Sequence, residues 1–257
     1  MEAEGAVKSR GGNSHPVFVF GSSLEFSFVG HYTLVSDFLP QRRLISMITK
    51  KRHPLLFNDN ETTGHDPLRK IGNYLVPWHE IIDMGAILVD PDTLEVLDTF
   101  EQKVIPTHPE RCLPNLVNHY PERARRGEWK NAVYLEPAVR KFLEFAGSRG
   151  VPAVVLGQNY FFDWSFISVA FAWCGIMESE WGRYLHYTKL DTRSMSVQEL
   201  LRPGEVYDPD EFSIRNGKLL ERLGIEPEPE VHAAINGARK AFEVYKKLRE
   251  IKRPTHY

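Results

Sequence analysis

The chain has 257 residues, of which 42% are hydrophobic and 12% aromatic, so it can form a hydrophobic core and is not globally disordered. Its 32 basic and 34 acidic residues give a net charge of -2, which excludes an overall basic surface of the kind that clamps long duplex nucleic acid. Cys112 and Cys174 match neither a metal-binding spacing nor a disulfide framework, and no window reaches the ~18 apolar residues of a membrane span. These features predict a cytoplasmic protein without a membrane segment.

The first part of the chain differs from the rest. Residues 1–46 are rich in Gly and Ser, and their short aromatic runs show no sustained helical period. Met47 begins a short polar, basic segment that is followed by an apolar one. We therefore expect residues 1–46 to be an N-terminal extension that need not belong to the fold, or a consequence of start-site choice, and residues 47–257 to form the domain.

The next part of the chain predicts strands. Residues 55–60 begin as an apolar run, and residues 81–89 are apolar apart from Asp83, as in a strand that is covered on both faces. Residues 90–93, which read DPDT, have the chemistry of a tight turn. Residues 94–105 should then return antiparallel, which gives a sheet that starts with three antiparallel strands.

Helices and strands alternate after this point. Apolar residues at helical spacing begin at Leu135, and the apolar run 153–156 predicts a short buried strand. Residues 162–173 predict a largely buried helix, and residues 231–248 carry the clearest apolar stripe in the chain. This order predicts an α/β fold, in which a mixed sheet is flanked by helices on both faces.

Two carboxylates lie at the end of the first predicted strand. Asp59 and Glu61 should point to the same face, about 7 Å apart along the strand, and would repel each other unless something neutralises them. Hard cations such as Mg²⁺ or Mn²⁺ prefer carboxylate oxygens. A solvated strand end explains most pairs of this kind, but this pair ends an apolar strand and runs into a polar turn. Just before the acids, Asn58 should face a normally apolar layer, where it needs a hydrogen-bond partner if it is buried.

Five motifs, in this order, resemble those of the DnaQ-like, DEDDh-type 3'-5' exonucleases of the ribonuclease H-like superfamily. They are DNETTG at 59–64, HEIIDMGAILVD at 79–90, GQNYFFDWSF at 157–166, KLDT at 189–192 and VHAAINGARKAFEVY at 231–245. The resemblance covers residues 54 to about 250 and implies a ribonuclease H-like fold, in agreement with the predicted sheet. It further implies a magnesium- or manganese-dependent exonuclease that removes nucleotides from single-stranded DNA or RNA 3' ends.

The resemblance assigns roles to four residues. Two metal ions, held roughly 4 Å apart, would hydrolyse the phosphodiester. By motif, Asp59 would bridge both metals, Glu61 would bind the metal on the side of the nucleophile, and Asp163 would bind the second metal. His232 would act as general base on the attacking water. The structural alternative for Asp163 is a cap on the helix that it begins.

The resemblance also suggests which residues contact the substrate. Thr62, Thr63 and Gly64 would form the wall against which the 3'-terminal nucleotide rests. Asn159 and Phe162 would form the adjoining edge, although Phe162 begins an apolar helix and so also suits the core.

One position departs from the family pattern. The last motif places an acid five residues after the His, but here that residue is Gly237. Asp191 and Glu230 are other possible donors, and the Asp of the KLDT element is usually structural. We expect a glycine there neither to pack against other residues nor to bind metal. The sequence therefore predicts a weakened metal position and reduced activity, or alternatively an inactive module that binds nucleic-acid ends or a partner protein.

Overall fold

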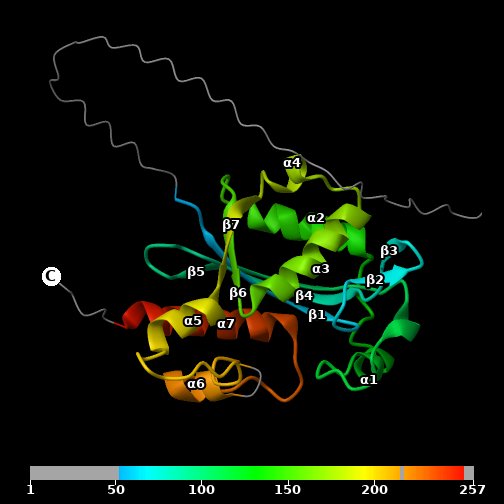
Figure 1. Ribbon diagram of the computed structural model, residues 1–257. Helices are drawn as coiled ribbons and strands as arrows, with labels where there is room; N and C mark the ends of the chain where they lie inside the picture. Colours follow the sequence, from blue (N-terminus) through cyan, green and yellow to red (C-terminus); the bar gives the residue numbers. More distant parts are fainter. Residues whose placement is uncertain (1–51, 215–216, 252–257) are drawn as a thin grey trace, which may run out of the picture. The chain divides into compact units, whose positions relative to one another are not determined.

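The computed structural model describes residues 52–214 and 217–251 (Figure 1). The predicted extension, residues 1–46, lies outside these ranges. No helix in the described ranges is long and apolar enough to cross a membrane. Cys112 and Cys174, both in the described ranges, are free cysteines.

The centre of the structure is a five-stranded mixed sheet with the order β5-β4-β1-β6-β7. Its first strand, β1, pairs antiparallel with β4 and parallel with β6; β4 pairs antiparallel with β5, and β6 pairs parallel with β7. The predicted mixed sheet is therefore confirmed, including its antiparallel start. The strands are β1 (Leu55–Thr62), β4 (Ile81–Val89), β5 (Val96–Lys103), β6 (Ala153–Gly157) and β7 (Leu185–Asp191).

Helices cover both faces of this sheet, with α2 and α3 on one side and α5 and α7 on the other (Figure 1). The predicted helices are present, but α3 begins two residues earlier than expected and α7 begins only after His232. The helices are α1 (Tyr120–Arg125), α2 (Leu135–Ala146), α3 (Tyr160–Trp173), α4 (Glu178–Trp181), α5 (Thr192–Leu200), α6 (Lys218–Leu223) and α7 (Ala234–Glu250), with a short 3-10 turn at Pro109–Arg111.

Alternation along β1 divides its side chains between two cores. Leu56 packs with the side chains of α2 and α3, whereas Leu55 and Phe57 pack with those of α7. Because successive side chains point to opposite faces, Asp59 continues the row that faces α7. Asn60 continues the row that faces α3, so the end of β1 can present polar groups to both helices.

A second, two-stranded sheet lies between β1 and β4 in the sequence. It consists of β2 (Leu68–Ile71) and β3 (Tyr74–Pro77), which pair antiparallel around the turn at Gly72. The sequence did not predict this hairpin, because its exposed apolar residues show no buried face. The hairpin lies directly after Gly64, next to the end of β1 that carries the acids.

Candidate active site

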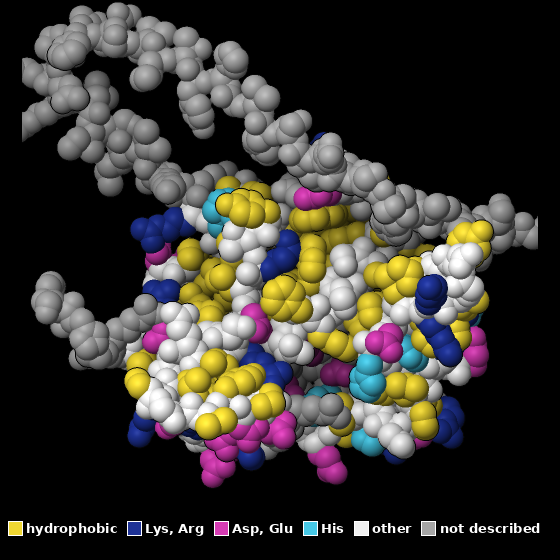
Figure 2. Space-filling view, viewed as in Figure 1, with side chains coloured by type: hydrophobic (Ala, Val, Ile, Leu, Met, Phe, Trp, Pro, Cys, Tyr) yellow, Lys and Arg dark blue, Asp and Glu magenta, His cyan; other side chains and the backbone are white. Residues whose placement is uncertain are grey.

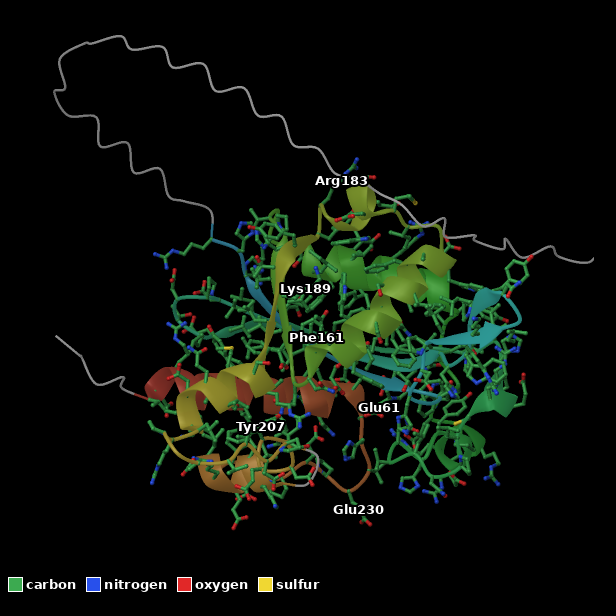
Figure 3. The ribbon with its side chains drawn as sticks, viewed as in Figure 1. Glu61, Phe161, Arg183, Lys189, Tyr207 and Glu230 are labelled. Carbon is green, nitrogen blue, oxygen red and sulfur yellow. The ribbon has the colours of Figure 1, made fainter. Side chains whose placement is uncertain are left out.

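Asp59 and Glu61 lie in the last half of β1, at the end where the strand leaves the sheet. In the β1–β4 register they lie opposite Gly85 and Asp83. Glu61 is 9% exposed, and Asp59 is partly exposed. Figure 3 shows Glu61 near the middle of the molecule, between the start of α3 and the loop that leads into α7, and Figure 2 shows acidic side chains recessed in a hollow on this face.

Asp163 reaches the same region from the first turn of α3. It is 3% exposed, and its Oδ1 accepts hydrogen bonds from the backbone N–H of Asn60 at 2.8 Å and from Asn60 Nδ2 at 3.1 Å. The carboxylate is thus held against β1, and the N-cap residue of α3 is Asn159 instead. The structure therefore places Asp163 against the end of β1, where its charge raises the pKa of Asp59.

The three carboxylates perturb one another. Burial, followed by the charges of Asp163 and Glu61, raises the pKa of Asp59 well above its usual value. Burial raises the pKa of Glu61 to about 7 against a hydrogen bond from Asn118, and burial likewise raises the pKa of Asp163 to about 8. Gathering like charges in a buried place is unfavourable for the folded chain alone, so this arrangement favours a bound cation.

His232 lies in the loop directly before α7. Its Nδ1 is 3.5 Å from Oε2 of Glu228, and its backbone carbonyl accepts a hydrogen bond of 2.8 Å from Nη1 of Arg123. The same Nη1 donates to the carbonyl of Asn118, so the largely buried Arg123 joins two loops beside Glu61. In the sequence Arg123 stands beside Arg125 and Arg126 in a basic cluster, but its guanidinium is turned inward to these two carbonyls.

Gly237, where the family pattern expects an acid, is buried against Asp59. A Cβ at position 237 would lie 2.5 Å from Oδ2 and 2.6 Å from Cγ of Asp59. Gly85, opposite Asp59, is equally tight, because a Cβ there would overlap the backbone of Ala234 and Ile235. The expectation that Gly237 does not pack is therefore wrong: the two glycines let the first turn of α7 lie directly on the strands that carry the acids.

Glu228 is an acid near this site that the sequence did not single out. Its side chain is 10% exposed, and its charge raises the pKa of both Asp59 and Glu61. It lies in the loop sequence EPEPE, where no hydrophobic period distinguishes one Glu from the next. The two other acids that the sequence suggested as metal ligands are not available. Asp191 caps α5 by accepting a hydrogen bond from the backbone N–H of Ser194. Glu230 is exposed at the outer edge of the loop (Figure 3).

The turn after β1 is fixed by hydrogen bonds. The N–H of Thr63 donates to the carbonyl of Glu80, and the hydroxyl of Thr62 donates to the carbonyl of Gly64 at 2.6 Å. Gly64 lies against the ring of His79, where a Cβ would overlap the imidazole. Residues 62–64 therefore form a hydrogen-bonded turn, in which the N–H of Thr63 is already used.

The predicted edge residues flank the start of α3. Asn159 is exposed and has a left-handed backbone with φ 55°. Phe162 is partly buried and packs 5.1 Å from the ring of Phe166, whereas its neighbour Phe161 is 77% exposed (Figure 3). An aromatic ring is thus free to contact a ligand here, and it belongs to Phe161.

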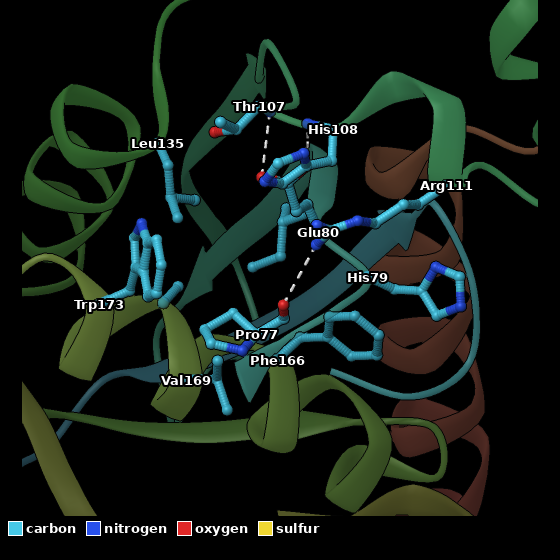
Figure 4. Close-up of a pocket in the computed structure, with 12 residues that line it drawn as sticks. Pro77, His79, Glu80, Thr107, His108, Arg111, Leu135, Phe166, Val169 and Trp173 are labelled. Carbon is cyan, nitrogen blue, oxygen red and sulfur yellow. Dashed lines mark hydrogen bonds between the residues drawn. The ribbon is translucent and has the colours of Figure 1, made fainter. Parts of the chain in front are cut away.

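Two cavities adjoin the hairpin. The first, of about 50 Å³, lies between α3 and the loop at Thr107, and most of its wall is apolar (Figure 4). The second, of about 580 Å³, opens beside Gly64 and is lined by His65, Arg69, Trp78, His79 and Arg111 among others. In the second cavity the guanidinium carbons of Arg69 and Arg111 each lie 4.4 Å from the centre of the Trp78 ring, so cationic groups surround an aromatic one.

The donor chemistry of the acids fits a hard divalent cation. In the described ranges no three His, Cys, Asp or Glu side chains already converge as a set of metal ligands, which is consistent with repulsion among uncompensated carboxylates. The oxygen Oδ1 of Asn60, whose Nδ2 bonds Asp163, is buried without a partner. An unpaired buried oxygen among raised-pKa carboxylates is what a cation or its water would satisfy.

No protein-family model matches this chain, and no curated protein matches it significantly. Solved structures match its fold. Exonuclease I of E. coli, solved with a dT13 oligonucleotide, is 17% identical with a TM-score of 0.56, over 77% of this chain and 41% of that one. A 3'-exonuclease solved for its recognition of the histone mRNA stem-loop is 16% identical with a TM-score of 0.55, over 80% and 68% of the two chains.

The nuclease domain of 3'hExo, described as a DEDDh family member and bound to rAMP, matches more completely. It is 16% identical with a TM-score of 0.54, over 77% of this chain and 92% of that domain. This chain spans less than half of exonuclease I but nearly all of the 3'hExo nuclease domain. These similarities show that this chain shares the fold of these exonuclease structures.

Proposed function

We propose that this protein is a metal-dependent 3'-5' exonuclease that acts on single-stranded DNA or RNA ends. The observation that carries the proposal is the gathering of Asp59, Glu61 and Asp163 at one end of β1, with pKa values raised by burial and by one another. None of the three forms a salt bridge within residues 52–214 and 217–251. Such a site suits Mg²⁺ or Mn²⁺, which would lower the pKa of a bound water and stabilise the leaving oxygen.

The chain's own residues have distinct tasks in this proposal. Asp59, Glu61 and Asp163 would hold the metal ions, and the imidazole of His232 would accept a proton from the attacking water. Arg123 holds the backbone of His232 in place from the α1 side. By the family pattern alone the site lacks one acid, and loss of one electrostatic stabiliser typically lowers a rate by about 10²- to 10³-fold.

The surroundings of the site support a single strand as substrate. Thr62, Thr63 and Gly64 would bound the terminal nucleotide, and Asn159 with the exposed ring of Phe161 would flank its base, while Phe162 supports that edge from the core side. Stacking of bases on exposed aromatic rings requires an unpaired strand. The preceding nucleotides would run toward the cavity beside Gly64, where Arg69 and Arg111 can meet phosphates.

The test is cleavage of 5'-labelled single-stranded DNA and RNA oligonucleotides by the full chain with Mg²⁺ or Mn²⁺. We expect stepwise shortening from the 3' end that disappears in Asp59→Asn and persists in Asp98→Asn, a matched change at an exposed acid of β5. Shortening that persists in Asp59→Asn would refute the assigned site. Binding of the oligonucleotide without any cleavage would favour the inactive binding module.

A further inference from the structure

Position 237 has no room for the acid that the family pattern expects there. The backbone of α7 lies so close to β1 that even a Cβ would meet the carboxylate of Asp59, 2.5 Å from Oδ2. Contacts of that length between real side chains are strongly repulsive, so a carboxylate could enter only if Asp59 moved. If the site binds metal with a full set of charges, the missing acid must come from another part of the chain.

We propose that Glu228 supplies this missing negative charge to the cation site, from the loop that precedes α7 instead of from α7 itself. The proposal rests on the proposed function, since it completes the same site. It differs from the family pattern in both sequence position and structural element.

The place of Glu228 carries the proposal. Its carboxylate lies 3.5 Å from Nδ1 of His232, and its side chain is only 10% exposed, so it points inward, toward the assigned general base. Its charge also raises the pKa of Asp59 and of Glu61, so the two acids of β1 lie within its electrostatic reach. A carboxylate in that place is within the electrostatic reach of any cation that the two acids hold.

The backbone of this loop explains how Glu228 reaches inward. Pro227 and Pro229 flank it, and proline fixes φ near −65° and removes a backbone donor, so this segment stays outside regular helix or strand. A side chain on such a loop can reach the acids past the start of α7. A side chain at position 237 would instead have to fit between α7 and β1. An acid on the loop can therefore reach the site, whereas an acid at position 237 of α7 would overlap Asp59.

Other acids in the described ranges are less suited to this role. Asp83 also raises the pKa of Asp59 and of Glu61, but its carboxylate is already paired with Nζ of Lys103 at 2.6 Å. Asp191 is occupied at the start of α5, and Glu230 is exposed. Burial raises the pKa of Glu228, against the opposing charge of Lys240, which pairs with Glu243 at 2.8 Å.

The test measures binding of Mn²⁺ alone to the full chain by isothermal titration calorimetry, without nucleic acid. We expect Glu228→Gln to weaken binding about 10- to 100-fold, the usual effect of removing a supporting group at a metal site. Glu230→Gln, a matched change two residues away at an exposed acid, should leave the affinity within about twofold. Glu228→Asp, which keeps the charge on a shorter side chain, should retain more affinity than Glu228→Gln; thermal melts would verify that each variant is folded.

Three results would overturn the proposal: unchanged affinity in Glu228→Gln, equal weakening in Glu230→Gln, or no Mn²⁺ binding by the native chain. Cleavage is scored separately. If the native chain binds Mn²⁺, loses it in Glu228→Gln and cuts no oligonucleotide, the proposed function fails and the role of Glu228 stands. If the chain cuts oligonucleotides but Glu228→Gln binds Mn²⁺ normally, the function stands and the role of Glu228 fails.

Discussion

Replacing Gly237 with alanine tests the close packing of α7 on β1. In an unobstructed helix interior, Gly to Ala stabilises a protein by roughly 1 kcal/mol, because alanine restricts the unfolded chain. Here the new Cβ would lie 2.5 Å from Oδ2 and 2.6 Å from Cγ of Asp59, and overpacking typically costs about 1–3 kcal/mol. We therefore expect Gly237→Ala to leave the free energy of unfolding unchanged or to lower it by up to about 2 kcal/mol.

A double-mutant cycle isolates the contact. In an Asp59→Ala background the obstructing carboxylate is gone, so Gly237→Ala should stabilise the chain by roughly 1 kcal/mol, as in an ordinary helix. Urea unfolding of the four chains in EDTA measures each free energy of unfolding, and the two effects of Gly237→Ala should differ by about 1–3 kcal/mol. If Gly237→Ala stabilises both backgrounds equally, the helix does not press on Asp59 and the argument about position 237 fails.

Two further predictions concern pH and substrate. The pKa of Glu61 is raised from 4.5 to about 7 in the folded chain, so between these pH values the folded state keeps a proton that the unfolded state releases. The free energy of unfolding of the metal-free protein should therefore fall as the pH rises from about 4.5 to 7, by an amount on the order of 3 kcal/mol. Urea unfolding at pH 5 and 7 would show a smaller fall in Glu61→Gln, and an identical fall would contradict the assignment. Arg69→Ala should raise KM for an oligonucleotide about tenfold without changing hydrolysis of the p-nitrophenyl ester of thymidine 5'-monophosphate, which is too short to reach the cavity beside Gly64. Arg125→Ala, at a guanidinium that is 75% exposed, is the control, and equal effects of the two changes would refute a path along that cavity.

Regular patterns allowed much of the fold to be predicted from sequence. The largely apolar run of β4 predicted its bounds, Ile81–Val89, because a strand covered on both faces has few polar residues, and here Asp83 is the only charged one. The return strand was predicted too long at both ends, since its exposed face weakens the pattern. The prediction that Asn58 requires a hydrogen-bond partner is also confirmed, because its Nδ2 donates to the carbonyl of Gly85 at 3.0 Å.

The parts of the site that sequence did not predict lie in loops or depend on packing. Glu228 and Asn118 carry no periodicity, and their proximity to Glu61 arises only when distant loops meet. In the sequence nothing distinguishes Arg123 from its exposed basic neighbours, because its hydrogen bonds to two loop carbonyls arise only in the fold. The sequence suggested that Gly237 is a missing metal ligand. The structure shows that a glycine at this position also lets α7 pack closely on β1.

The packing of α7 on β1 also affects when the acids can come together. The two elements are far apart in the sequence, and contacts between distant segments form late and slowly during folding. Until α7 and the loop before it dock, the chain carries Asp59 and Glu61 without His232 or Glu228 beside them. A newly made or partly unfolded molecule would therefore contain the proposed acids but no assembled site, so any nuclease activity would appear only when folding is complete.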